Sequence, residues 1–513
     1  MVSVILLAAF VCMVIYYAYE YATHRPKNFP PGPPRIPFFG AYLFFLLVNF
    51  KSTHSAALLF SKWYKSKMLG FYLGSYPTVV VHSHEGVKEV LLRPEFDGRP
   101  DLFAGRLREP NFNRKGIFFN DGPIWKVQRR FILRYLRDFG FGRRFDELEI
   151  FVNEELMELV DIMKNGPEYP HEHRFFRKNQ ALCPYFMSPV MVNAFLKIFC
   201  NEKIPRADQE AVGDLAMATE EFQRIADDYG RLVSLFPWIR HFFPKTSGFK
   251  DLARSNAVIY KFVKNIIVRH EKTFEPDHIR NFVDMYLEEL QREEGKVDTT
   301  FAIDQFIMGI VDFIFPAISA ISTQLSFLFQ WFLRKPEILK KIQAEIDEVV
   351  GNGRLPTLDD RQHLHYTEAS LRECLRLETL VPSNLPHRAI ADTELLGYSI
   401  PADTIVYTGL YGFHNDKDTW GDPEEFRPER FLDYRGHFSN KKDISLPFGA
   451  GKRLCAGETF ARNMLFLTAG AICQNFNIIR GKGESLPDPK ETICGLIRTP
   501  PDYWVHYEIR ENH

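Results

Sequence analysis

The sequence lacks paired cysteines and any excess of charge. Its seven cysteines are scattered over 513 residues and show no C-x-x-C or zinc-finger spacing. An odd, dispersed set argues against a disulfide framework and favours a reducing compartment. The net charge of −1 gives no electrostatic case for binding nucleic acid. Internal repeats and low-complexity blocks are also missing, so beyond the N-terminal region we expect one large domain.

A long apolar run opens the sequence. Residues 2–19 carry no charge, and no basic residue precedes them. A cleaved signal peptide would begin with a basic region and end at a small-residue cleavage site, so we expect an uncleaved transmembrane signal anchor over residues 1–21. The basic residues Arg25 and Lys27 come after the run, which predicts that the body of the chain stays on the cytoplasmic side.

A proline-rich segment separates this anchor from the rest of the chain. Prolines fix φ and favour an extended backbone, so we expect a stiff hinge over residues 22–40. Residues 41–513 then form the globular domain. Its patterns predict mainly helix, for example over 336–350 and 367–380. They also predict a small β region, with one or two strands in 72–81 and a small sheet from 393–400 and 404–407.

A glycine-rich loop near the C-terminus carries Cys455. The loop reads Phe448-Gly-Ala-Gly451-Lys-Arg453-Leu-Cys455-Ala-Gly, and a long apolar helix pattern follows it. A thiolate that ligates a haem iron must be held rigidly, on a backbone without bulky side chains that lets the porphyrin approach. A nearby cation such as Arg453 helps to keep the sulfur ionised. The loop therefore predicts a haem–thiolate site.

This F-x-x-G-x-R-x-C-x-G pattern resembles the haem-binding signature of the cytochrome P-450 superfamily. The resemblance runs from the proline segment to the last predicted strands, and residues 125–142 look most like microsomal members that include many insect proteins. It implies a mainly α cytochrome P-450 fold with a small β-sheet region. It also implies haem (iron protoporphyrin IX) as cofactor, with the Cys455 thiolate as axial iron ligand and with Phe448 and Gly451 shaping the loop.

Five further residues are candidate contacts to the cofactor. An indole N–H and a guanidinium both donate hydrogen bonds, which suits the two propionate carboxylates of haem. By position in the family pattern, the resemblance implies this role for Trp125, Arg129, Arg453, His387 and Arg99.

A second group has a predicted structural role. Glu373 and Arg376 are three residues apart on a predicted helix and share a face. The motif Pro428-Glu-Arg430-Phe follows some way downstream, before the cysteine loop. In the family that the chain resembles, such a glutamate and two arginines lock the cysteine-bearing segment, so we expect Glu373, Arg376 and Arg430 to do the same.

The predicted central helix departs from the family pattern. Where the family has an acid followed by threonine, this sequence has Ser319 and Ala320, and Pro316 interrupts the helix pattern. We therefore keep three hypotheses. The first is a monooxygenase in which water, Ser319 or a substrate hydroxyl relays protons. The second is a haem–thiolate isomerase or dehydratase acting on a peroxide or epoxide. The third is a non-catalytic haem-binding sensor. We favour the first.

The favoured hypothesis is an oxidoreductase that inserts one atom of O2 into a small hydrophobic substrate, such as a hormone, lipid, sterol or xenobiotic. The resemblance implies electrons from NADPH through NADPH–cytochrome P-450 reductase, with cytochrome b5 as an optional second donor. It also implies a single-pass location in the endoplasmic reticulum membrane, on the cytoplasmic face. Exposed basic residues such as Lys126, Arg130 and Arg134 are candidates for receiving the electron donor.

Overall fold

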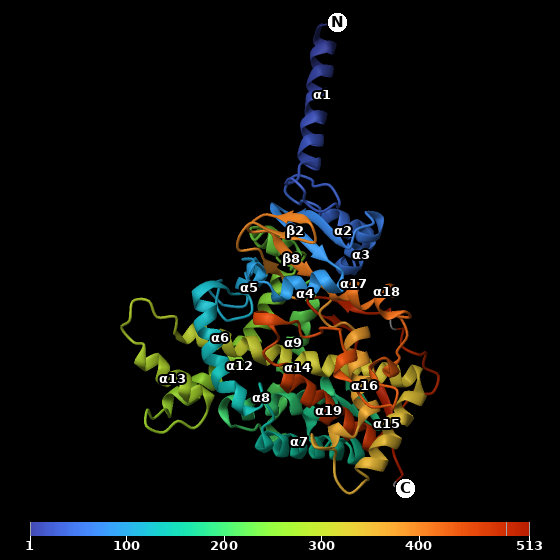
Figure 1. Ribbon diagram of the computed structural model, residues 1–513. Coiled ribbons are helices and arrows are strands. Elements are labelled where there is room, and N and C mark those ends of the chain that lie inside the picture. The colour runs from blue at the N-terminus through green and yellow to red at the C-terminus, as the bar shows by residue number, and fades with distance from the viewer. Residues whose placement is uncertain (1, 489, 512–513) are drawn as a thin grey trace.

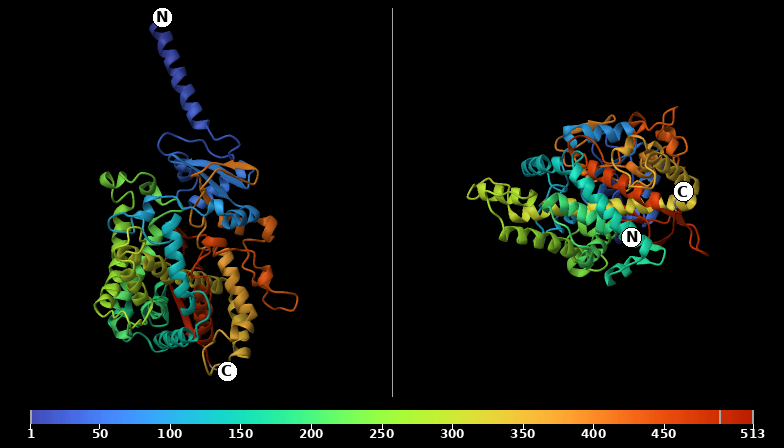
Figure 2. Two further views of the ribbon diagram at one scale, coloured as in Figure 1. Left: turned by 60° about the vertical axis from the view of Figure 1, so that its left-hand side comes forward. Right: turned by 90° about the horizontal axis from the view of Figure 1, so that it is seen from below.

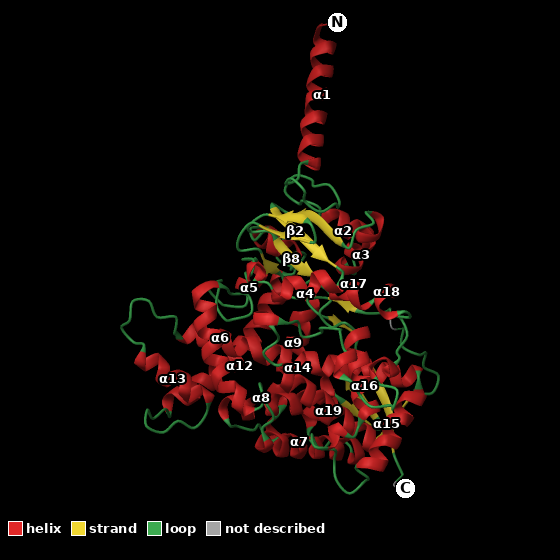
Figure 3. Ribbon diagram, in the orientation of Figure 1, coloured by secondary structure: helices red, strands yellow, loops and turns green. Residues whose placement is uncertain are grey.

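The computed structural model describes residues 2–488 and 490–511. Helices make up most of the body and surround α14 (Ile303–Arg334), a 32-residue helix that is buried along most of its length. Figure 3 shows the strands as small groups at the periphery of this helical mass. The mainly helical fold with a small β region is therefore confirmed.

The other α-helices vary widely in length. Their bounds are α1 Val2–Thr23, α2 Tyr42–Asn49, α3 Thr53–Trp63, α4 His84–Leu92, α5 Phe103–Arg106, α6 Gly122–Leu136, α7 Asp146–Asn165, α8 Ser188–Cys200, α9 Glu210–Ile225, α10 Arg231–Leu235, α11 Ile239–Phe242, α12 Phe249–Lys272, α13 Phe282–Arg292, α15 Pro336–Val349, α16 His365–Leu377, α17 Leu410–His414, α18 Lys417–Trp420 and α19 Glu458–Asn475. The predicted helices at 336–350 and 367–380 correspond to α15 and α16. The second ends earlier than predicted, because the Glu378 carboxylate turns to accept hydrogen bonds from Trp331 (2.7 Å) and Arg498 (2.6 Å).

The strands form two four-stranded sheets and two hairpins. Their bounds are β1 Met68–Leu73, β2 Tyr76–Val81, β3 Phe176–Arg177, β4 Gln180–Cys183, β5 His387–Arg388, β6 Thr393–Leu395, β7 Tyr398–Ile400, β8 Ile405–Thr408, β9 Phe476–Ile479, β10 Ile493–Cys494, β11 Arg498–Thr499 and β12 Tyr503–Ile509. The sheet orders are β1-β2-β8-β5 and β3-β4-β12-β9, and the hairpins are β6-β7 and β10-β11.

The prediction of one small sheet from 393–400 and 404–407 is wrong. Strands β6 and β7 pair only with each other, whereas β8 runs parallel to β2, with Val79 opposite Val406. Strand β2 is hydrogen-bonded along both of its edges, to β1 on one side and to β8 on the other, so it lies inside the sheet and its valines are buried. Of the strands predicted over 72–81, β2 lies within that range, whereas β1 begins earlier and overlaps it only at residues 72–73.

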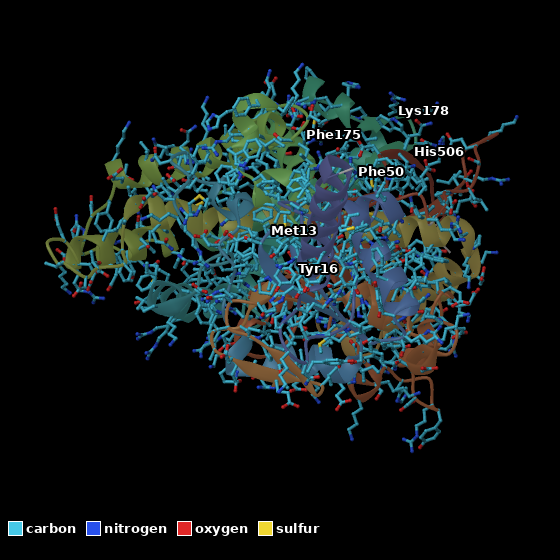
Figure 4. The ribbon with its side chains drawn as sticks, turned by 90° about the horizontal axis from the view of Figure 1, so that it is seen from above. Met13, Tyr16, Phe50, Phe175, Lys178 and His506 are labelled. Atoms are coloured by element: carbon cyan, nitrogen blue, oxygen red, sulfur yellow. The ribbon has the colours of Figure 1, made fainter. Side chains whose placement is uncertain are left out.

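The N-terminal helix α1 projects away from the body, and the C-terminus lies at the opposite end of the molecule (Figures 1 and 2). Apolar side chains on α1 are exposed, such as those of Met13 (48%) and Tyr16 (60%), which are labelled in the view from above in Figure 4. Among the described residues, α14 is the single unbroken helix that has both the length and the hydropathy of a membrane span, and 89% of its apolar window is buried inside the protein. The apolar character of α14 is thus that of a core helix.

The segment after α1 packs closely against the first sheet. The guanidinium of Arg25 donates to the main-chain oxygens of Pro30 (2.9 Å), Pro33 (3.0 Å) and Gly70 (3.1 Å), and also to that of Gly32. Gly70 belongs to β1, and Gly32 lies so close to it that a Cβ at residue 32 would meet the Gly70 oxygen at 2.1 Å. The proline-rich residues are therefore fixed to the sheet at this point.

A buried ion pair joins the loop before α6 to α14. Arg108 and Asp312 are paired through Nη1 and Oδ1, and both side chains are almost completely buried. Asp312 also accepts the main-chain N–H groups of Ile117 (2.6 Å) and Phe118 (2.9 Å). One carboxylate thus fixes two parts of the same loop on the central helix.

We expect Arg108→Leu to destabilise the protein strongly, because it leaves the Asp312 carboxylate buried without its cation. The free energy of unfolding, measured by denaturant titration of the full chain, should fall by ~3–5 kcal/mol. As a control, Arg254→Leu removes an exposed pair with Glu221, in which the two side chains are 59% and 38% accessible. That change should cost less than about 1 kcal/mol. Equal effects of the two substitutions would contradict the role given to Arg108.

Candidate active site

A large cavity lies between α14 and the cysteine loop. It encloses about 1510 Å³ of space free of protein atoms, part of which is open to solvent. The helix α14 contributes Phe313, Phe315, Pro316, Ala317, Ala320 and Ile321, and the cysteine loop contributes the segment from Pro447 to Gly457 in part. Most of the lining is apolar. The cavity therefore has room for a large flat cofactor together with an apolar ligand.

The cysteine loop presents Cys455 to this cavity. The Cys455 N–H donates to the main-chain oxygen of Phe448 at 2.9 Å, which closes the loop on itself. Gly451 has φ +66°, and a Cβ at that position would lie 2.2 Å from the main-chain oxygen of Leu91 in α4, so both the backbone angle and this close approach require a glycine here. The Cys455 side chain is accessible from the cavity but otherwise enclosed by protein, and this desolvation raises the pKa of its thiol, while the main-chain N–H of Gly457 and the charge of Arg129 act to lower it.

Three arginines gather at one side of the cavity. Arg99, Arg129 and Arg453 all line it. Burial, followed by repulsion from Arg129, lowers the pKa of Arg453 to about 9, and burial together with Arg453 and Arg129 lowers the pKa of Arg99 well below its usual range. Their hydrogen bonds go to main-chain oxygens, such as Arg453 to Asp97 (2.7 Å) and Arg129 to Leu454 (2.6 Å). Such a concentration of buried positive charge calls for an anionic partner.

Trp125 gives independent evidence that an anionic ligand binds beside these arginines. Its ring lies 3.6 Å from the Arg453 guanidinium, and its indole Nε1 is buried with no hydrogen-bond partner. A buried donor without an acceptor costs ~1–3 kcal/mol unless a ligand satisfies it. A carboxylate beside Trp125 and the three arginines would satisfy the indole donor and offset the charge. The residues present therefore fit a haem, whose propionates would lie here and whose iron would face Cys455.

His387 is placed differently from the other predicted contacts. It is buried, its Nδ1 donates to the Phe96 oxygen at 2.8 Å, and it does not line the cavity. Burial and the charges of Arg99 and Arg453 lower its pKa well below the usual range. A neutral ring with Nδ1 protonated has no second N–H to give to a carboxylate. Its role as a propionate contact stays a prediction.

The structure brings Glu373, Arg376 and Arg430 together. Arg376 pairs with Glu373 through two hydrogen bonds of 2.8 Å, and Arg430 Nε donates to the same carboxylate at 3.1 Å. All three side chains are buried. Arg376 also donates to the main-chain oxygen of His414 (2.7 Å), so the group joins α16 to the segment that leads into the cysteine loop.

The three departures on α14 occupy different surroundings. The helix continues through Pro316, which lines the cavity, as does Ala320. Ser319 does not line it. Its hydroxyl donates to the Phe315 oxygen at 2.8 Å and accepts a hydrogen bond from Gln223 of α9. In this structure the Ser319 hydroxyl therefore contacts α9. Among the described residues of α14, no threonine lines the cavity in place of the one that the family pattern has there.

Sequence reasoning missed the contribution of α9. Gln223 lines the cavity, and one turn earlier Glu220 lies 3.5 Å from the Thr323 hydroxyl. Burial, partly opposed by Arg224, raises the pKa of Glu220 to about 7. Neither residue belongs to a local motif. The helical spacing of apolar residues along α9 places Glu220 and Gln223 on the inward face of that helix. It does not predict that this face packs against α14.

Comparison with known proteins gives the family directly. The cytochrome P-450 family model matches residues 30–506. The chain belongs to the cytochrome P-450 family. It is 30% identical over 505 residues to a farnesoate epoxidase of Bombyx mori, covering 98% of each protein. It is 33% identical over 467 residues to cytochrome P-450 2J2 of Homo sapiens, covering 90% of this chain and 88% of that protein. A probable cytochrome P-450 305a1 of Drosophila melanogaster is 30% identical over 525 residues.

Membership confirms several predictions at the level of the family. The chain is a haem–thiolate protein and an oxidoreductase of the type that incorporates molecular oxygen. The relatives include insect and microsomal proteins, as the residues at 125–142 predict. At about 30% identity the comparisons leave the substrate open, and the roles of individual residues rest on the geometry above.

We expect Gly451→Ala to displace the cysteine loop, because the new Cβ would overlap the Leu91 oxygen and the φ of +66° disfavours alanine. A penalty above ~1.4 kcal/mol would shift the equilibrium between the native and the displaced loop at least tenfold toward the displaced one. The carbon monoxide difference spectrum of the reduced protein should show a loss of the thiolate-ligated species.

Gly436→Ala is the matched control. Gly436 also has a positive φ, of +80°, but a Cβ there would meet nothing within 4 Å. This variant should keep the thiolate-ligated spectrum of the unchanged protein. Full thiolate ligation in Gly451→Ala would show that the close approach to Leu91 is dispensable.

Proposed function

We propose that Cys455 is the axial ligand of a monooxygenase that oxidises a small hydrophobic substrate. One observation carries the proposal: Cys455 lies on a rigid glycine loop at the wall of a large apolar cavity, facing α14. The substrate class is a hormone, lipid, sterol or xenobiotic. Farnesoate, which is named for the Bombyx mori relative, is the first compound to test.

Haem bound in this cavity supplies the oxygen-activating chemistry, with thiolate ligation favouring O–O cleavage. The chain's own residues bind and orient it. Arg99, Arg129 and Arg453 line the cavity and are placed to donate hydrogen bonds to its carboxylates. Trp125 does not line the cavity, but its ring packs on Arg453, and its buried Nε1 has no partner in the protein. Phenylalanines on α14 and in the loop before α6 exclude water from the opposite side: Phe313, Phe315 and Phe118 line the cavity with edge-on and tilted ring contacts.

The membrane location is part of the proposal. Helix α1 exposes its apolar side chains, and near its base the body exposes further large apolar residues, including Phe50 (74%), labelled in Figure 4. The segment around Trp238 and Phe242 is similarly exposed, and it packs on the N-terminal region through a Phe39–Phe236 contact of 5.4 Å between ring centroids. We infer that α1 anchors the chain in the endoplasmic reticulum membrane and that these residues lie in the lipid interface.

Helix α6 offers a surface for the electron donor. Lys126, Arg130 and Arg134 are spaced four residues apart, so they share one exposed face of the helix. The same helix carries Trp125 and Arg129 on its inner side, next to the cofactor site. An acidic reductase that docks on this face would bring its flavin close to the haem edge.

The reaction is tested by reconstitution with NADPH, reductase and 18O2, with farnesoate among the substrates. We expect one labelled oxygen in the product. Cys455→Ala should lose both product and the thiolate-ligated carbon monoxide spectrum, whereas the control Cys494→Ala, at another partly accessible cysteine, should keep them. Product formed without reductase or oxygen would instead favour an isomerase or dehydratase, and binding without product would favour a sensor.

Charge reversal tests the docking face. The triple variant Lys126→Glu, Arg130→Glu, Arg134→Glu should slow haem reduction by the reductase about tenfold or more at low ionic strength, and the difference should shrink as salt increases. Stopped-flow reduction under carbon monoxide measures this rate. Lys261→Glu with Lys264→Glu, at exposed positions on α12, is the control and should leave the rate within a factor of two. An unchanged rate in the triple variant would place the docking site elsewhere.

A further inference from the structure

Three metal-ligating side chains of different chemistry meet where the ends of α8 and α12 lie next to the start of α13 (Figure 1). Cys200 ends α8, Glu202 follows two residues later, and His270 lies in the last turn of α12. One ligand atom from each of the three lies within 4.8 Å of the other two. Among the described residues this is the one such group of three, and none of its members lines the cavity at Cys455.

The backbone at the end of α8 fixes the position of the first two side chains. Asn201 lies between them with φ +53°, a left-handed conformation that ends the helix and that asparagine tolerates well. Asn281 begins α13, and its amide donates to the main-chain oxygen of Cys200 at 3.1 Å. The turn that carries Cys200 and Glu202 is therefore held against α13.

The histidine and the carboxylate already have the separation of two zinc ligands. His270 Nε2 lies 3.0 Å from Glu202 Oε1, and two ligand atoms on a tetrahedral zinc with bonds of about 2.0–2.1 Å are roughly 3.3 Å apart. Arg269 donates to the second oxygen of Glu202 at 2.7 Å, which leaves Oε1 to face His270.

The far side of the imidazole ring has the surroundings of a metal-bound histidine. His270 Nδ1 lies 3.6 Å from Asp284 Oδ1 and 3.4 Å from the amide nitrogen of Asn281. Histidines that ligate a metal through one nitrogen usually direct the N–H of the other toward a carboxylate or a carbonyl. The buried Asp284 carboxylate is in the position to orient His270 in this way.

Cys200 supplies the ligand that distinguishes zinc from the hard cations. Its side chain is 3% exposed, and its Sγ donates to the Leu196 oxygen at 3.2 Å. Burial, and then the charge of Glu202, raises the pKa of the Cys200 thiol, so without a metal the sulfur keeps its proton. Mg²⁺ and Ca²⁺ take oxygen ligands, whereas a thiolate, an imidazole and a carboxylate together suit Zn²⁺.

We propose that Cys200, Glu202 and His270 bind one zinc ion, with water as the fourth ligand. As the S–Zn bond forms, the S–H bond breaks and its proton leaves to solvent. Glu202 is 35% accessible, so the ion and the water reach the site from the surface. The ion ties the end of α8 to the end of α12, and its binding does not depend on the proposed function.

The first test is a titration of zinc chloride into the haem-loaded full chain after dialysis against a chelator. Calorimetry at about pH 8, where a free imidazole is neutral, should show one tight zinc site per chain. The melting temperature should rise with zinc, because only the folded chain presents the three ligands together. Cys200→Ser, His270→Gln and Glu202→Gln should each weaken binding about tenfold or more.

The second test identifies the ligands by X-ray absorption at the zinc edge, to which the haem iron does not contribute. We expect one sulfur at about 2.3 Å together with nitrogen and oxygen atoms at about 2.0–2.1 Å. The sulfur signal should be lost in Cys200→Ser. Calorimetry in two buffers of different ionisation enthalpy should show that the unchanged chain releases at least one proton per zinc, from the thiol.

His506→Gln is the matched control. His506 Nε2 lies 2.9 Å from Glu484 Oε1, which is the same kind of histidine–carboxylate pair, but among the described residues no cysteine completes a group of three there. This variant should keep the zinc affinity of the unchanged chain.

Two results would overturn the inference. One is zinc binding by the unchanged chain that is no tighter than that of Cys200→Ser, and the other is a zinc spectrum without sulfur. Either would show that His270 and Glu202 form an ion pair only. The carbon monoxide spectrum of each variant reports separately whether the fold and the haem site are intact, so a loss of zinc binding with an unchanged spectrum is assigned to the zinc ligands.

Discussion

The carboxylate of Glu373 is the charge on which the packing of α16 against the segment from His414 to Arg430 depends. It lies deep in the protein, where a lone charge would be prohibitively costly. Two guanidinium groups and the N–H of Arg427 (2.9 Å) satisfy it. Because Arg376 and Arg430 each also bind main-chain oxygens of the segment from His414 to Glu425, this segment cannot move relative to α16 without leaving buried charges unpaired. The cysteine loop, from Phe448, lies further along the same stretch of chain.

Two separate groups of contacts form the cofactor pocket, one on the side of the cysteine loop and one on the side of α14. On one side, the loop glycines and Glu373 fix the sulfur, and the arginines with Trp125 collect positive charge and an unpaired donor. On the other side, α14 is held by the buried pair Arg108–Asp312 and by the amide of Gln223. The first set lacks an anion, which the propionates of a haem would supply.

The sequence anticipates those parts of the site whose residues lie close together along the chain. Local geometry is enough to predict three parts of the site: the loop around Cys455, the Glu373–Arg376 spacing on one helix turn, and the placement of Trp125 and Arg129 one helical turn apart. The position of β8 beside β2 and the approach of Gln223 to Ser319 join segments separated by roughly a hundred residues or more. Such contacts depend on how whole layers pack, and their residues follow no local pattern. The resemblance to the family predicts the order of the motifs along the chain. It does not predict the hydrogen bonds that the Ser319 hydroxyl makes with Phe315 and Gln223.

The clamp formed by Arg25 has a consequence for the junction between α1 and the body. A single guanidinium holds four carbonyl oxygens, three from the proline-rich segment and one from β1, so the junction is a fixed joint and not a swivel. A shortened protein prepared for crystallography should therefore begin upstream of residue 25. Cutting the chain closer to the first sheet would strip four oxygens of their shared donor and loosen the contact between the proline-rich segment and the edge strand β1.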